Sequence, residues 1–192
     1  MATSGLSNLK YAVMEQEDTA TTPPVYETPQ DLPGINSVSV TPETETATLW
    51  GDNQALKTKT KLKKKTVSLE IAKLAPKDRA KIFGHTYNSD TNTVTVSKND
   101  KPPYLALLFR VDTEDDDKAE LHALYKGKFA PAQEDTNTEG ENLEFGLHTL
   151  EGEFIFRQDS PQKLEDIRTI DVSDTVTEAA FFSTVGGGLT NS

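Results

Sequence analysis

The chain has 192 residues, of which 34% are apolar and none is cysteine, and its acidic residues outnumber its basic ones by 31 to 20. This length allows a hydrophobic core without metals or cross-links, and the lack of cysteine excludes disulfides, thiolate metal sites and cysteine nucleophiles. The net charge of -11 disfavours a dedicated duplex-binding protein, because an acidic surface repels phosphate. The low apolar content predicts a small β core that carries long polar arms and loops.

Residues 1–8 lack the basic start and the apolar stretch of a signal peptide. No segment of the sequence approaches the roughly 20 consecutive apolar residues that are needed to cross a bilayer. We therefore expect a soluble chain with no membrane partner, made in the cytoplasm.

The first fifty residues predict short strands that are separated by a loop. Leu9–Met14 alternates as a strand, and residues 15–34 carry four prolines, which favour irregular backbone. Ile35–Thr41 alternates again, and Ala47–Trp50 predicts a further short strand.

Residues 57–65 are unusual, since six of the nine are lysine and the first part alternates strictly with threonine. We assign residues 51–66 to a long loop. One interpretation is a solvated hairpin arm whose lysines discourage edge-to-edge aggregation. Another is an arm that docks on an acidic surface of a neighbouring subunit. Nucleic-acid binding by this run is disfavoured, because no aromatic residues are interleaved for base stacking. The candidate inter-subunit residues are Lys57, Lys59, Lys61, Lys63, Lys64 and Lys65.

The middle of the chain predicts a strand followed by a helix. Apolar residues alternate with polar ones on one strand face, formed by Val67, Leu69 and Ile71. Residues 76–83 predict a helix, because Pro76 suits the first helical position and Gly84 suits the C-terminal cap. Ala80 and Phe83 share a face, so this helix is expected to lie against a sheet.

Tyr104–Val111 is the most apolar run, and both of its faces are apolar, which predicts a strand covered on both sides. An acidic turn over 112–118 leads to residues 119–129, and the two strands are expected to form an antiparallel hairpin. Residues 143–157 predict a further strand.

The sequence then becomes polar, and we divide the chain into a β domain over residues 1–157 and a C-terminal arm over residues 158–192. Within the arm lies an apolar cluster that includes Val176, Phe181 and Phe182. An apolar patch at the end of a polar tail has little of its own domain to pack against. It is interpreted either as an arm that finds a pocket on a neighbouring subunit or as a last core strand.

The sequence carries no constellation that predicts catalysis, a cofactor or a metal site. The three histidines, at positions 85, 122 and 148, lack the spacing of a zinc hydrolase, and those at 122 and 148 are expected at the surface. The acidic run 112–117 fails the register of a calcium loop. The glycines 186–188 are not followed by the lysine of a phosphate-binding loop.

Several segments together resemble one family, the major tail proteins (tail tube proteins) of siphophages, particularly of phages that infect Gram-positive hosts. The resemblance covers residues 5–157, with the segments in the family's order. These segments are Gly5–Ala12, Leu49–Asn53, Val67–His85, Tyr104–Val111, Leu124–Pro131, Gly140–Phe145 and Thr149–Phe154.

The resemblance implies a mainly β fold, a β-sandwich or rolled barrel with one flanking α-helix, shared with type VI secretion tube proteins. It implies a non-enzymatic virion protein that stacks as hexameric rings into a tube for DNA ejection. Its partners would be copies of itself, the tape measure, tail terminator and distal tail proteins, and DNA only in passage. Lumen-facing residues would be net acidic or neutral, and residues 57–65 and 176–182 would bridge adjacent rings.

Two other classes of protein fit the same composition. One is another β-rich structural protein, such as a capsid decoration protein or a secretion-system tube subunit. The other is a soluble carbohydrate-binding module, which would be a stable monomer that its ligand stabilises thermally.

Overall fold

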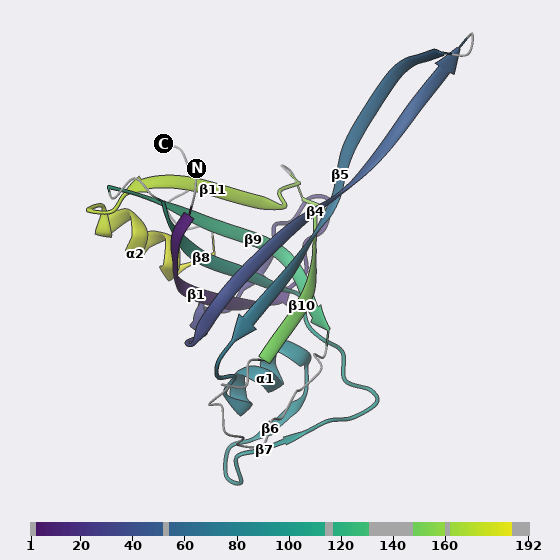
Figure 1. Cartoon of the computed structure of the whole chain (residues 1–192). Helices are drawn as coiled ribbons and strands as arrows, with labels where there is room; N and C mark the ends of the chain where they lie inside the picture. The colour runs from purple at the N-terminus through teal and green to yellow at the C-terminus, as the bar shows by residue number, and fades with distance from the viewer. Residues whose placement is uncertain (1–2, 52–53, 114–116, 131–147, 160–161, 186–192) are drawn as a thin grey trace, which may run out of the picture.

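The computed structural model describes residues 3–51, 54–113, 117–130, 148–159 and 162–185. Antiparallel strands dominate the fold, as predicted (Figure 1). The elements in chain order are β1 (Thr3–Gln16), β2 (Val25–Tyr26), β3 (Gln30–Asp31), β4 (Ile35–Gly51), β5 (Gln54–Ile71), α1 (Pro76–Phe83), β6 (Thr86–Asn88), β7 (Thr93–Thr95), β8 (Leu105–Thr113), β9 (Lys118–Ala130), β10 (His148–Ile155), β11 (Glu165–Asp171) and α2 (Thr175–Ser183).

One sheet folds into two layers at β9. The strand order is β2-β1-β8-β9-β10-β5-β4, and β11 also pairs with β9. The first part of β9, residues 118–124, pairs with β11, whereas residues 127–130 pair with β10. The layer β10-β5-β4 therefore crosses over the layer β1-β8-β9-β11, as Figure 1 shows.

The main core lies between these two layers. Val67, Leu69 and Ile71 of β5 are fully buried there, which confirms the predicted apolar face of that strand. They pack in one cluster with buried residues of the other layer, including Leu107 and Phe109 of β8. The opposite face of β8 is buried as well, through Leu108, so the prediction of a strand covered on both sides is confirmed. The predicted β8–β9 hairpin is also confirmed.

Helix α1 has the predicted bounds, Pro76–Phe83, and buries Ala80 and Phe83. Gly84 ends it in the left-handed conformation at a φ of 71° and donates its N–H to the Ala80 carbonyl. A Cβ on Gly84 would lie 2.2 Å from the carbonyl oxygen of Lys101, so only glycine fits this position.

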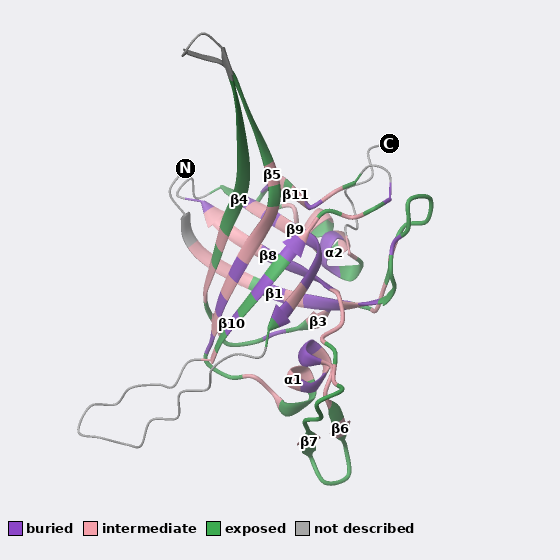
Figure 2. Cartoon of the chain, turned by 90° about the vertical axis from the view of Figure 1, so that its right-hand side faces the viewer, coloured by how far each residue is buried: buried purple, intermediate pink, exposed green. Residues whose placement is uncertain are grey.

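The segment predicted as a long loop, residues 51–66, is a strand wherever the structure describes it. β4 and β5 pair from Ile35 opposite Ile71 to Gly51 opposite Gln54, so the two short strands predicted over 35–50 are one continuous strand. β10 covers only residues 64–71 of β5. Beyond that point residues 44–51 and 54–62 project from the sandwich as a two-stranded ribbon (Figures 1 and 2), and residues 44–49 and 57–61 are exposed.

The predicted C-terminal arm is, over its described residues, part of the fold. Residues 165–171 form β11 and pair with β9, and a second helix, α2, follows. The Asp174 carboxylate accepts a hydrogen bond from the Thr177 N–H and caps α2. Phe181 and Phe182 are buried against the face of the β8-β9-β11 layer that points away from the main core, so the expectation that this cluster has little of its own domain to pack against is wrong. The alternative of a last core strand is also wrong.

The sheet is not closed into a barrel. Within the described ranges β4 pairs only with β5, and β11 pairs only with β9, so both strands leave one edge free. Two sequence predictions lie partly outside the described residues, the acidic turn at 114–116 and the 143–157 strand in its first part. The glycines at 186–188 and the segment Gly140–Phe145 lie entirely outside them.

Candidate functional site: the hairpin, the outer face and the groove

The projecting ribbon has two chemically different faces. Directly opposed residues of an antiparallel pair lie on the same face. Lys57, Lys59 and Lys61 stand opposite Leu49, Ala47 and Glu45, whereas threonines stand opposite one another on the other face. The hydroxyls of Thr46 and Thr60 lie 3.1 Å apart across the strands. One face is therefore basic and the other is lined by neutral hydroxyls.

The six predicted contact lysines fall into two groups, which the structure separates along β5. Lys57, Lys59 and Lys61 are exposed and have no carboxylate partner among the described residues. The other three are paired within their own chain. Lys63 lies 3.2 Å from Glu45, Lys64 lies 2.6 Å from Glu153 and 3.5 Å from Glu43, and Lys65 contacts Glu165.

The three apolar residues of the C-terminal segment that were predicted to contact a neighbouring subunit differ in their exposure. Val176 is 80% exposed on α2, whereas Phe181 and Phe182 are buried in their own chain. Contact with a neighbouring subunit remains a prediction for this segment, and Val176 is the residue whose side chain is free to make it.

The outer face of the β10-β5-β4 layer is mainly polar, with one isoleucine, Ile155, opposite Lys64. Its cross-strand rows combine short hydroxyl residues with carboxylates, namely Ser37–Glu70–Thr149, Ser39–Ser68–Glu151 and Thr41–Thr66–Glu153. Glu43 and Lys64 continue it at the base of the ribbon. Hydrogen bonds from the Ser37 hydroxyl and the Asn36 amide lower the pKa of Glu70, which keeps that carboxyl charged.

A groove opens between the two layers beside the base of the ribbon. It has a volume of about 550 Å³. Its apolar lining consists of Leu6, Val38, Val40, Phe109, Val111 and Ile167. Ile167, on β11, is 54% exposed at the groove, which is unusual for isoleucine in a strand.

A charged cluster lies at one side of this groove. The His122 ring stacks on Phe109 with centroids 4.8 Å apart, and its Nδ1 lies 3.0 Å from Glu165. Its Nε2 lies 3.4 Å from Glu120. Burial opposes ionisation of Glu165, but hydrogen bonds from His122 and Lys65 outweigh it and lower the pKa of that carboxyl. His122 is therefore partly buried and bonded, and the expectation of an ordinary surface histidine is wrong.

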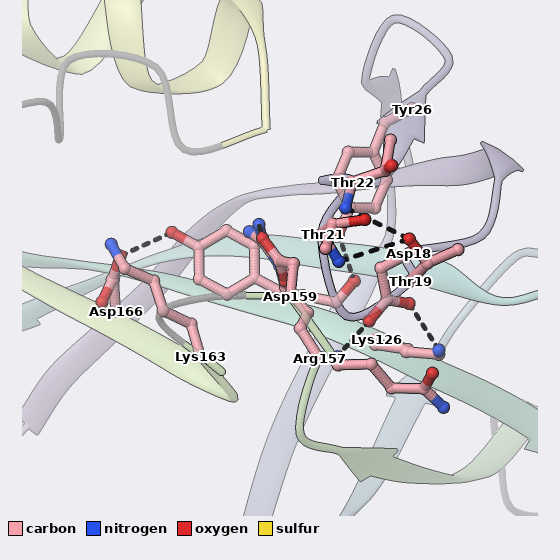
Figure 3. Close-up of polar contacts among 12 residues, drawn as sticks. Asp18, Thr19, Thr21, Thr22, Tyr26, Lys126, Arg157, Asp159, Lys163 and Asp166 are labelled. Carbon is pink, nitrogen blue, oxygen red and sulfur yellow. Dashed lines mark hydrogen bonds and ion pairs between the residues drawn. The ribbon is translucent and has the colours of Figure 1, made fainter.

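A buried polar cluster fixes the path of the chain from β10 into β11 (Figure 3). Lys126 of β9 donates to Asp18, and the Gln158 N–H donates to the other Asp18 oxygen. Burial opposes ionisation of Asp18, but these two hydrogen bonds lower its pKa overall. Arg157 pairs with Asp159 and lies over the Tyr125 ring. The cluster holds the 17–27 segment and the chain after β10 against β9.

Sequence reasoning missed this cluster because its members are far apart in the chain, with Asp18 and Lys126 separated by 108 positions. In the part of the chain that the structure describes, no group of three or more histidine or acidic side chains could hold a metal ion. The same part contains no helix long and apolar enough to span a membrane.

Free sheet edges, a projecting ribbon and an apolar groove together define a β-rich subunit suited to contacts with other protein chains. A family model described as phage tail tube protein matches residues 1–148. The chain therefore belongs to the phage tail tube protein family, and it is a structural component of the virion tail. No curated protein matches the chain. The match confirms the resemblance to tail tube proteins, and it ends before β11 and α2. A siphophage origin and a Gram-positive host remain predictions.

Proposed function

We propose that this chain polymerises as stacked hexameric rings and that the resulting tail tube is the conduit for DNA ejection. The observation that carries the proposal is the open sheet, whose β4 edge has no partner among the described residues. An unpaired strand edge exposes a row of backbone donors and acceptors, and pairing with a neighbouring copy satisfies them. Head-to-tail contacts of this kind generate rings when the rotation closes.

The outer face of the β10-β5-β4 layer supplies a suitable wall for the conduit. It carries four glutamates, at positions 43, 70, 151 and 153, and one lysine, Lys64, so its net charge is negative. Its other side chains are mainly serine and threonine. Such a surface repels the phosphates of duplex DNA and offers no basic patch to retain it. We therefore assign this face to the lumen, which matches the acidic or neutral wall expected from the sequence.

The β4–β5 ribbon is the element that joins one ring to the next in this proposal. An isolated two-stranded ribbon is marginally stable in water, so contact with another subunit stabilises it. Its unpaired lysines, Lys57, Lys59 and Lys61, are free to meet carboxylates there. The tape measure protein would lie inside the tube, and the tail terminator and distal tail proteins would bind its two ends.

Electron microscopy of the concentrated, purified protein tests the proposal. Hollow tubes with a repeating ring spacing, and six-fold symmetry in end-on views, are the expected result. A monodisperse monomer at all concentrations would contradict it. A capsid decoration protein would likewise form no tube alone, and a carbohydrate-binding module would show ligand-dependent thermal stabilisation instead.

A further inference from the structure

Near the tip of the ribbon, the described residues include one large apolar side chain that its own chain leaves exposed, Leu49. Leu49 is 62% exposed near the end of β4. The sequence places a tryptophan next to it, at position 50, and a leucine at position 56 on the returning strand. From Thr44 to Gly51, at about 3.3 Å per residue, the ribbon extends roughly 23 Å, so its tip can reach another subunit.

The groove between the two layers is an apolar surface of matching kind. It offers Phe109, Val111 and Ile167 on one wall and Val38 and Val40 on the other. A cleft that exposes branched aliphatic side chains beside polar ones is typical of a binding site for another chain. Its volume, about 550 Å³, is several times that of one large apolar side chain.

The charges of the two surfaces are complementary. The chain has 20 basic and 31 acidic residues, and residues 44–62 hold three lysines and two acidic residues. The remainder therefore has 17 basic and 29 acidic residues, a net charge of -12, while the ribbon is net positive. The groove shares the negative charge of the remainder, because two carboxylates, Glu120 and Glu165, line it together with one lysine, Lys65. Attraction between unlike charges orients such an encounter and disfavours wrong partners.

We propose that the ribbon tip of one copy docks in this groove of the next copy, with Leu49 among the apolar side chains and the free lysines beside Glu120. The proposal rests on the proposed function, because it requires the chain to assemble with itself, and it names the acceptor surface that assembly uses. The contact is heterologous, so each copy donates its ribbon once and accepts another once.

Photo-crosslinking in the assembled protein tests the docking. Isotopically light protein with benzoylphenylalanine at position 49 is mixed with heavy wild-type protein, polymerised and irradiated. The expected result is light–heavy adducts on the groove strands, at or beside Ile167, Val111 or Leu6. Adducts that map elsewhere in well-formed tubes overturn the docking and leave the proposed function intact. If the wild-type protein forms no tubes, the proposed function fails, and the docking fails with it.

Two groove variants provide an independent test. Ile167→Asp and Glu120→Lys alter side chains that are at least partly exposed, so the subunit should stay folded. Each is expected to raise the protein concentration needed for half-maximal tube formation about tenfold or more. Lys59→Glu combined with Glu120→Lys should recover part of that loss. Val96→Asp, a matched change at an exposed apolar residue outside the groove, should have no effect. Unchanged assembly of both groove variants overturns the proposal.

Discussion

The buried ion pair between Asp18 and Lys126 gives the sharpest stability prediction. The two side chains are 0% and 3% exposed. Asp18→Asn keeps the size of the side chain but leaves the Lys126 ammonium buried without a counter-charge. Removing one partner of a buried pair costs about 3 to 5 kcal/mol. The free energy of unfolding should fall by about 3 kcal/mol, because the amide still accepts one hydrogen bond.

Urea unfolding, followed by circular dichroism at protein concentrations too low for assembly, measures this loss. In a chain of this size about 3 kcal/mol corresponds to roughly 6 to 12 °C in Tm. Adding Lys126→Met to Asp18→Asn removes the stranded charge, so the double variant should be more stable than the sum of the two single changes predicts. Glu45→Gln, which breaks the exposed pair with Lys63, is the control and should cost less than about 1 kcal/mol.

The same pair predicts a pH dependence whose sign follows from the lowered pKa of Asp18. A carboxyl with a depressed folded-state pKa stabilises the fold above its unfolded pKa of about 3.9, and this stabilisation is lost as pH falls through the folded value. The stability gap between wild type and Asp18→Asn should therefore be full at pH 7 and shrink below about pH 4. A loss under about 1 kcal/mol at pH 7, or a gap that does not change with pH, would refute the reasoning.

Three further predictions address assembly and the corrected parts of the fold. Changing Lys59, Lys61 and Lys63 to glutamate should leave the monomer folded by circular dichroism yet impair ring stacking in sedimentation; normal tubes would exclude a docking role. Phe181→Ala should lower the free energy of unfolding by about 3 kcal/mol or more in urea titration, because the side chain is fully buried; a change under about 1 kcal/mol would show that α2 is dispensable. Gly84→Ala should cost more than about 1 kcal/mol by the same titration, since positive φ and a close carbonyl both oppose a Cβ; a neutral effect would contradict the described cap.

Elements whose own residues carry a strong periodic signal could be predicted from the sequence. β8 is apolar on both faces and lies between two cores, and the period-two pattern of β5 from Val67 to Ile71 reports one buried face. Helix α1 was predictable to the residue because proline and glycine mark its two ends. In these cases local sequence and tertiary burial agree.

The ribbon and the C-terminal elements could not be predicted correctly, because the residues that pair with them or pack against them lie in other parts of the chain. Residues 57–63 have polar side chains on both ribbon faces apart from Leu62, so no burial pattern separates a strand from a loop. β11 is largely polar, and it forms a strand because it pairs with the edge of β9. α2 is short, and it is stabilised by a surface of β8 and β9 that the sequence does not reveal.

The candidate surfaces were predictable only in part. The lysine run indicated a contact element, but its division into free and paired residues depends on four glutamates, at positions 43, 45, 153 and 165, of which two lie about ninety or more positions away. The groove requires residues from β1, β4, β5, β8, β9 and β11 together. No single stretch of sequence contains enough of it to be recognised.

The most direct test of the central claim is a cryo-electron microscopy reconstruction of the polymerised protein at a resolution that separates strands. The account predicts a hollow tube in which the free edge of β4 pairs with a neighbouring copy and the serine, threonine and glutamate face of β10-β5-β4 lines the channel. A reconstruction in which β4 stays unpaired, or in which this face points away from the channel, would contradict it.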